Sequence, residues 1–124
     1  MKRIAQLMTP QPWTVQIDDS IAVARQMMVE REIHHLPVLD GQKVAGIVTQ
    51  RELARISDRA STVARAMISV PRVAPDTPVE DVLDTMIDER SDAIVVTREN
   101  TVEGIFTATD AVRALRELMR ARHR

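Results

Sequence analysis

The sequence has no cysteine, and its aromatic residues are limited to Trp13 and Phe106. The absence of cysteine excludes disulfides, thiolate nucleophiles and zinc sites built on cysteine. With so few aromatic side chains, the core must be built from Val, Ile, Leu, Ala and the seven Met residues. No apolar run approaches the roughly 20 residues that a membrane-spanning helix requires.

The chain also lacks a charge of one sign in excess, because the formal net charge of its 124 residues is −1. This balance argues against nucleic acid as a partner of the whole chain. The first ten residues, MKRIAQLMTP, lack the apolar segment of a signal peptide. We therefore expect a cytoplasmic protein with no membrane partner. Hydrophobic residues make up 44% of the chain, which is typical of a globular domain.

One short sequence motif occurs twice. GIVTQRE, from Gly46 to Glu52, returns as GIFTATD, from Gly104 to Asp110. The offset that takes Gly46 to Gly104 also pairs further identical residues, which are Val15 with Val73, Asp18 with Asp76, Met28 with Met86, Val38 with Val96, Val44 with Val102, and Arg55 with Arg113. An internal repeat fixes the architecture of a chain. We predict two repeats, 1–58 and 59–124, with Ser57–Ser61 as linker and packed with pseudo-twofold symmetry.

Each repeat shows the same order of elements, β-α-β-β-α, which predicts a mixed α+β (α/β) fold. Ser20 offers an N-cap to a first helix, and Thr77–Glu80 offers the second helix a capping box with Pro78 at its first position. Apolar residues at helical spacing follow, which are Ile21, Ala24, Met27 and Met28, then Val79, Val82, Leu83, Met86 and Ile87. The predicted strands are Leu36–Leu39, Val44–Thr49, Ala93–Thr97 and Val102–Thr107, and the closing helices are 50–57 and 108–122.

The repeated motif has the pattern G-h-h-T-x-x-acid, where h is an apolar residue. The glycine lets another backbone or a ligand come close to the strand. The threonine can cap the following helix, and the acidic residue suits its first turn. In a second interpretation, the free N–H groups of the helix start bind a phosphate while the carboxylate accepts the hydroxyls of a ribose. Local chemistry alone leaves both interpretations open.

Several segments carry a family resemblance together: LMTP (Leu7–Pro10) with its echo AMI (Ala66–Ile68), HHLPVLDGQKVAGIVTQRE (His34–Glu52) and DAIVVTRENTVEGIFTATD (Asp92–Asp110). On these segments, and over nearly its whole length, the chain resembles a tandem pair of CBS (cystathionine-beta-synthase-type) domains forming one Bateman module. The resemblance implies binding rather than catalysis. The implied ligand is AMP, ADP or ATP, with S-adenosylmethionine or NAD as alternatives, and no cofactor is required.

The resemblance also implies two clefts between the repeats. In each cleft one repeat holds the base, and the T-x-x-acid motif of the other holds ribose and phosphate. Carried over by position, the first cleft would use Met8, Trp13, Ile33, His35 and Pro37 around the base, with Thr107, Thr109 and Asp110 opposite. The second cleft would use Ile68, Arg72, Ser91 and Ala93, with Thr49, Arg51 and Glu52 opposite.

Two departures from the family pattern fall in the second cleft. Glu52 stands where Asp is usual, and Val95 stands where Pro37 stands in the first repeat. A carboxylate displaced by one methylene weakens a two-point contact with a ribose. We therefore expect the first cleft, with Asp110, to be the main ligand site.

Other polar and aromatic features leave alternatives open. His34 and His35 point to opposite faces of an extended strand, so they do not chelate one metal ion. No Ser/His/acid set or carboxylate pair indicates catalysis, so we expect no enzyme. Trp13 can stack on adenine, pack against the fold or lie at a dimer surface. The basic last helix contains Arg113, Arg116, Arg120, Arg122 and Arg124, and either solvation or contact with phosphate, nucleic acid or an acidic partner explains it.

The sequence thus predicts an adenosine-nucleotide-binding regulatory module that transmits its ligand state to a partner. The resemblance implies a homodimer formed through amphipathic helices, and the regulated protein is unknown. The alternative is a ligand-free structural or oligomerisation module that acts through protein contacts. A third reading, of a different class, is a nucleic-acid binder that uses the arginine-rich helix.

Overall fold

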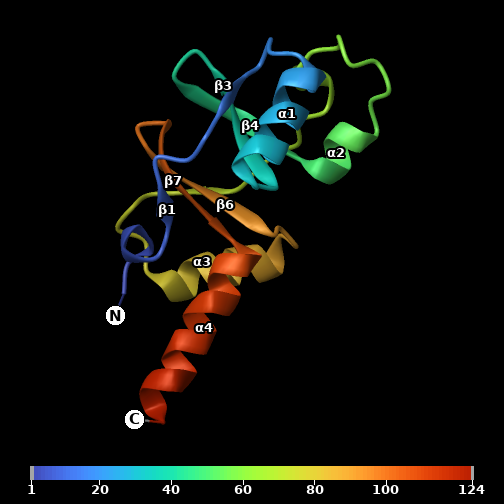
Figure 1. Ribbon diagram of the computed structural model, residues 1–124. Helices are drawn as coiled ribbons and strands as arrows, with labels where there is room; N and C mark the ends of the chain where they lie inside the picture. The colour runs from blue at the N-terminus through green and yellow to red at the C-terminus, as the bar shows by residue number, and fades with distance from the viewer. Residues whose placement is uncertain (1, 124) are drawn as a thin grey trace. The chain divides into compact units, whose positions relative to one another are not determined.

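The computed structural model describes residues 2–123, and its elements follow the predicted order (Figure 1). The first repeat contains β2 (Val15–Gln16), α1 (Ile21–Arg31), β3 (His35–Asp40), β4 (Lys43–Thr49) and α2 (Gln50–Ala54). The second contains β5 (Arg72–Val73), α3 (Val79–Asp88), β6 (Ala93–Arg98), β7 (Thr101–Thr107) and α4 (Ala108–Arg122). Short elements precede them, namely η1 (Ile4–Gln6), β1 (Thr9–Pro10) and η2 (Val63–Arg65). The predicted mixed α+β fold is confirmed.

The described residues form two compact units that do not coincide with the two repeats of the sequence. Unit 1 is formed by described residues of Met1–Gln11, Pro71–Arg98 and Glu103–Arg124. Unit 2 is formed by Pro12–Val70 and Glu99–Val102. Each unit therefore combines the helices and most of the strands of one repeat with the segment that precedes the first strand, β2 or β5, of the other repeat.

Unit 1 places β7 beside β6, with β5 parallel to the far side of β6. Strand β1 pairs antiparallel with β7, so that Thr9 lies opposite Ile105. The core of this unit contains Ile4, Val82, Met86, Ile94, Val96 and Phe106. Both Ile4 and Phe106 are fully buried. The segment before β1 thus contributes to a core built mainly from the second repeat.

Unit 2 has β3 between β2, which is parallel to it, and β4, which is antiparallel. Its core contains Val15, Ile21, Ala24, Met28, Leu36, Val38, Val48, Leu53, Val63 and Ala66. Val63 and Ala66 come from the segment after the linker, and Ile68 pairs with Ile47 through two backbone hydrogen bonds of 2.9 Å. The segment before β5 therefore completes the unit built mainly from the first repeat.

Three local predictions about the helices are wrong. Helix α3 begins after Pro78, which is the N-cap without a side-chain hydrogen bond, so the predicted capping box from Thr77 does not form. Ile87 is 74% exposed and lies off the buried face of α3. Helix α2 ends at Ala54, where the Arg25 guanidinium donates to the carbonyls of Leu53 and Ile56 at 2.6 and 2.8 Å.

The first helices of the two repeats, α1 and α3, end alike. Glu32 follows α1 with a φ of 53°, and Arg90, which is its counterpart in the second repeat, has a φ of 52°. These left-handed residues let the next residue donate to the last turn, as Ile33 N–H does to Met28 at 3.1 Å. Between residues 2 and 123 no helix has the length and apolar character needed to cross a membrane.

Candidate functional site

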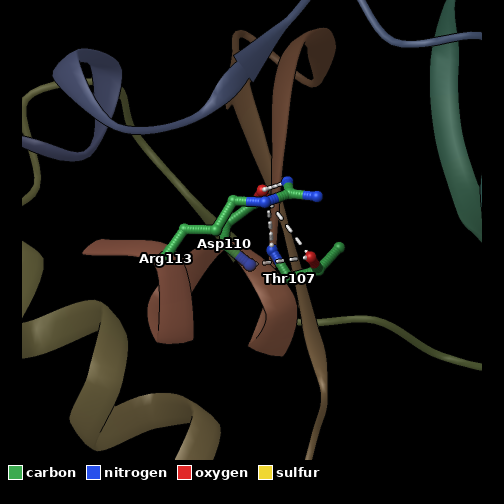
Figure 2. A network of polar contacts seen from close by, with 3 residues as sticks. All are labelled: Thr107, Asp110 and Arg113. Carbon is green, nitrogen blue, oxygen red and sulfur yellow. Dashed lines mark hydrogen bonds and ion pairs between the residues drawn. The ribbon is translucent and has the colours of Figure 1, made fainter. Parts of the chain in front are cut away.

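The strongest candidate site lies at the start of α4 in unit 1, where Thr107, Asp110 and Arg113 form a polar network (Figure 2). The Asp110 carboxylate oxygen Oδ2 accepts from the Thr107 backbone N–H at 2.9 Å and from the Thr107 hydroxyl at 3.1 Å. The Asp110 N–H points back to the Thr107 hydroxyl at 3.4 Å. These contacts form a capping box, which is the first of the two interpretations that the sequence left open for this motif.

The second oxygen of Asp110 has a different partner. Oδ1 lies 3.4 Å from a guanidinium nitrogen of Arg113, one helical turn further along. The Asp110 side chain is 14% exposed, and that of Arg113 is 65% exposed. An ion pair with one partner in solvent contributes little and is readily exchanged. Oδ1 is therefore the atom at which Asp110 can accept hydroxyl groups of a ligand while Oδ2 keeps its capping role.

The first copy of the motif, in unit 2, is arranged differently. The Thr49 hydroxyl donates to Glu52 Oε2, but Thr49 forms no capping bond with the start of α2. Glu52 is 5% exposed and is also 3.6 Å from the Arg51 guanidinium. Burial, the largest effect, raises the pKa of the Glu52 carboxyl. The Thr49 hydrogen bond, the carboxyl's own backbone N–H and the charges of Arg51 and Arg55 together lower this pKa below its ordinary value.

The motif glycines allow a second segment to approach. A Cβ on Gly46 would lie 2.6 Å from the carbonyl oxygen of Ile68, in the segment paired with β4. A Cβ on Gly104 would overlap the Met8 side chain, whose segment pairs with β7. The sequence predicted that another backbone or a ligand comes close to each glycine. At both positions the neighbour is another segment of the same chain. In unit 1 this approach brings Met8 to the strand that leads to Thr107.

Unit 2 contains four of the residues predicted to surround the base. Trp13 is 51% exposed, and the Arg31 guanidinium carbon lies 4.0 Å from the centre of its ring. This contact places Trp13 beside the end of α1, from which the chain leads through Ile33 to His35. Ile33 and His35 are half-buried, and Pro37 is buried in β3. Thr109, by contrast, is exposed in the first turn of α4 in unit 1.

The residues predicted for the second cleft differ widely in exposure. Ala93 is 2% exposed, and Ser91 donates its hydroxyl to the Ala93 carbonyl at 2.8 Å in unit 1. Arg72 is exposed in β5 of the same unit. In unit 2, Ile68 is 41% exposed while its backbone is paired, and Arg51 is exposed. Within residues 2–123 no three His, Asp or Glu side chains gather as a metal site.

Sequence reasoning left two of these arginines outside the predicted sites. Arg113 was seen only as part of the basic helix, although its place one helical turn after Asp110 could have indicated a contact on one helix face. Arg31 lies far along the chain from Trp13, and no periodicity links the two positions. Arg124, a further member of the predicted basic set, lies outside the described residues.

Comparison with known proteins supports this architecture. The CBS domain model matches residues 4–59 and 63–117. The chain is 31% identical to an uncharacterized 17.7 kDa protein of Acidianus ambivalens, over 91% of this chain and 73% of that protein. It is 26% identical to the A-adding tRNA nucleotidyltransferase of Geobacter sulfurreducens, over 91% of this chain but only 13% of the enzyme. The similarity to that enzyme therefore concerns a small part of it.

Two solved structures have the same fold. The CBS domain pair of protein MJ0100, solved with 5-methylthioadenosine and S-adenosyl-L-methionine, is 25% identical with a TM-score of 0.84, covering 93% of this chain and 96% of that one. CBSX2, solved with AMP, is 22% identical with a TM-score of 0.85, covering 96% of this chain and 99% of that one. With both repeats matched by the family model and the pair fold shared, the chain belongs to the CBS domain family.

Proposed function

We propose that the chain binds an adenosine-type ligand and acts as a regulatory module rather than as an enzyme. The observation that carries this proposal is the Asp110 carboxylate at the start of α4, with one oxygen held by Thr107 and the other facing an exposed arginine. The adenosine ligands of MJ0100 and CBSX2 support it. AMP, ADP and ATP are the ligands we expect first, with S-adenosylmethionine and NAD as alternatives.

The proposal assigns different parts of the ligand to different residues. Asp110 accepts the ribose hydroxyls, while Thr107 and Thr109 lie at the helix start, where free N–H groups suit a phosphate. The base is assigned to Met8, Trp13, Ile33, His35 and Pro37. The set around Glu52 is the weaker one, because that carboxylate is 5% exposed and already accepts from Thr49.

Regulation would follow from a shift of population. A ligand that binds one arrangement of the chain more tightly than another shifts the chain toward that arrangement. A regulated partner that distinguishes the arrangements then responds to the ligand. The shift can be no larger than the difference between the two affinities, so a weakly discriminating nucleotide would be a weak signal.

The test is calorimetric titration of Asp110→Ala with AMP and ATP. We expect the affinity to fall by about tenfold or more, because a charged hydrogen-bond partner of the ribose is lost. Glu117→Ala is the matched control, since it removes an exposed carboxylate from the same helix, and it should bind like the unaltered chain. Unchanged affinity in Asp110→Ala would show that this site is assigned wrongly.

The alternative function is a ligand-free module that acts through protein contacts. Thermal shift against AMP, ADP, ATP, NAD and S-adenosylmethionine separates the two functions, because a ligand that binds only the folded state raises the unfolding temperature. A lack of any shift across all five compounds would favour the structural module. A shift with one of them names the ligand.

We also propose that two copies associate through α3 and α4. Helix α4 has no buried residue, and Leu115, Leu118 and Met119 are each more than half exposed. A groove of about 650 Å³ beside it has apolar walls, which include Leu7, Val79, Leu83, Phe106, Leu115 and Leu118. The exposed charges are complementary, since α3 presents Glu80, Asp81, Asp84 and Asp88 while α4 presents Arg113, Arg116, Arg120 and Arg122. A second copy, with α3 and α4 exchanged, satisfies both patterns.

A further inference from the structure

The contact between Trp13 and Arg31 is the least expected feature of unit 2. Trp13 lies between β1 and β2, in a stretch without helix or strand, and half of its surface is exposed. The Arg31 guanidinium carbon lies 4.0 Å from the centre of the Trp13 ring. At this distance the cation is attracted by the electron-rich face of the indole. The arginine is therefore one contact that holds the half-exposed ring.

Arg31 is itself well placed to hold the ring. It belongs to the last turn of α1, where a positive charge interacts favourably with the helix dipole. The chain then turns through Glu32, whose φ is 53°, and Ile33 N–H donates to Met28 at 3.1 Å. The hydrogen bonds at the end of α1 fix the backbone from which the Arg31 side chain extends.

The contact has a consequence for the residues that follow α1. Trp13 comes from far before the helix end, whereas Ile33 and His35 follow its last turn. By holding the indole at the helix end, Arg31 brings an aromatic face to the connection that leads into β3. One face of the indole is covered by the guanidinium. The exposed part of the ring remains available to stack on a planar base.

The second repeat has no equivalent of this pair. At the offset that takes Gly46 to Gly104, Trp13 corresponds to Pro71 and Arg31 corresponds to Glu89. Proline offers no aromatic face, and a carboxylate does not bind the face of a ring. The pair of Trp13 and Arg31 is thus present in the first repeat only, although the two repeats share the same order of helices and strands.

From these observations we infer that Arg31 is a positioning residue for base recognition, which holds Trp13 as the stacking surface for the adenine of the ligand. This inference rests on the proposed function and adds a residue that the motif does not contain. Arg31 acts through the indole and not on the phosphates. Its contribution should therefore be the same for adenosine, AMP and ATP.

The experiment measures binding of adenosine, AMP and ATP to Trp13→Ala, Arg31→Ala and the double variant. Trp13→Ala should lose about tenfold in affinity, the effect expected when one base loses its stacking partner. Arg31→Ala should lose about three- to fivefold for all three ligands, and Arg31→Lys should recover part of the loss because it keeps a cation near the ring. In the Trp13→Ala background, Arg31→Ala should have no further effect.

A second measurement needs no ligand. Trp13 is the only tryptophan, so the fluorescence anisotropy of the free chain reports directly on its motion. Arg31→Ala should lower this anisotropy, whereas Arg59→Ala, which removes another exposed arginine of unit 2, should leave it unchanged. Circular dichroism checks that each variant keeps its fold.

The outcomes separate the inference from the proposed function. If the unaltered chain binds none of the three ligands and shows no thermal shift with ADP, NAD or S-adenosylmethionine, both are overturned. If it binds them and Arg31→Ala binds equally well, only the role of Arg31 is overturned. A loss that grows from adenosine to AMP to ATP would show that Arg31 contacts phosphate, and it would likewise overturn the positioning role.

Discussion

Thr49 donates its hydroxyl to the Glu52 carboxylate, and Glu52 is almost completely buried. In the second copy of the motif, Asp110 instead accepts from the backbone N–H and the hydroxyl of Thr107 and caps a helix. The glutamate is longer by one methylene group, and its carboxylate accepts from the Thr49 hydroxyl while α2 starts without a side-chain capping bond. A change that looks conservative in the sequence therefore changes which donors the acid holds and how exposed it is.

Glu52→Gln should make the free energy of unfolding depend less on pH in the acidic range. The folded-state pKa of Glu52 is lowered, so its charged form stabilises the fold above the ordinary glutamate pKa of about 4.3, and this contribution is lost as pH falls through the folded value. Urea unfolding between neutral pH and roughly pH 3 measures this dependence. The variant should be less stable at neutral pH by about 1–3 kcal/mol, since a hydrogen bond to a charged group is lost. If both chains lost stability in parallel over that window, Glu52 would not contribute to it.

Gly46→Ala should destabilise the chain more than Gly104→Ala. The new methyl at 46 meets the Ile68 carbonyl oxygen at 2.6 Å, whereas at 104 the nearest atom is the sulfur of the flexible Met8 side chain. We expect a loss of about 1–3 kcal/mol for Gly46→Ala, as for overpacking elsewhere. Thermal unfolding gives the comparison.

A pair of double variants provides the control for this comparison. Met8→Ala should relieve part of the strain of Gly104→Ala, because it removes the side chain in the way. Met67→Ala should not relieve Gly46→Ala, since a backbone carbonyl is the obstacle there. Equal rescue at both positions would contradict the assignment of a backbone obstacle to Gly46.

Charge reversal tests the proposed association of two copies. A chain with Asp84→Lys and Asp88→Lys presents lysines on α3 against the arginines of α4, and a chain with Arg116→Glu and Arg120→Glu presents glutamates on α4 against the acidic residues of α3. Each should remain monomeric alone, because like charges then face each other across the contact. Mixed together, they should form a heterodimer, since each α3 then meets an α4 of opposite charge. Native mass spectrometry distinguishes the three species, and self-association of either variant at the unaltered level would exclude this interface.

Much of the fold follows from patterns that repeat within the chain. The sequence predicted β7 to begin within one residue of Thr101 and α4 to span Ala108–Arg122, because the strand runs into the repeated motif and a good cap stands at Thr107. The capping box at Thr77 failed because Pro78, which cannot donate a backbone hydrogen bond, itself became the cap residue. Local patterns describe each element well, but competition between neighbouring residues decides its boundary.

The site is less readable from the sequence, because its contacts join distant positions. Thr107 and Asp110 lie within one helical turn and could be paired from spacing alone. Trp13 and Arg31 meet only because the end of α1 returns to the segment before β2. The assembly of the units was also unexpected, since Ile4 packs in the core with Phe106 rather than with its own repeat. Contacts between residues so far apart in the chain leave no periodic pattern in the sequence.

The exchange of segments between the repeats has a consequence for the history of the chain. A gene fragment that encodes one repeat would contribute Ile4 without Phe106, or Val63 without Val48, and so would leave each core short of residues. Loss, transfer or duplication of one repeat alone would therefore leave a core incomplete. The heritable module is therefore the pair, which is the smallest stretch of this sequence that carries its complete cores with it.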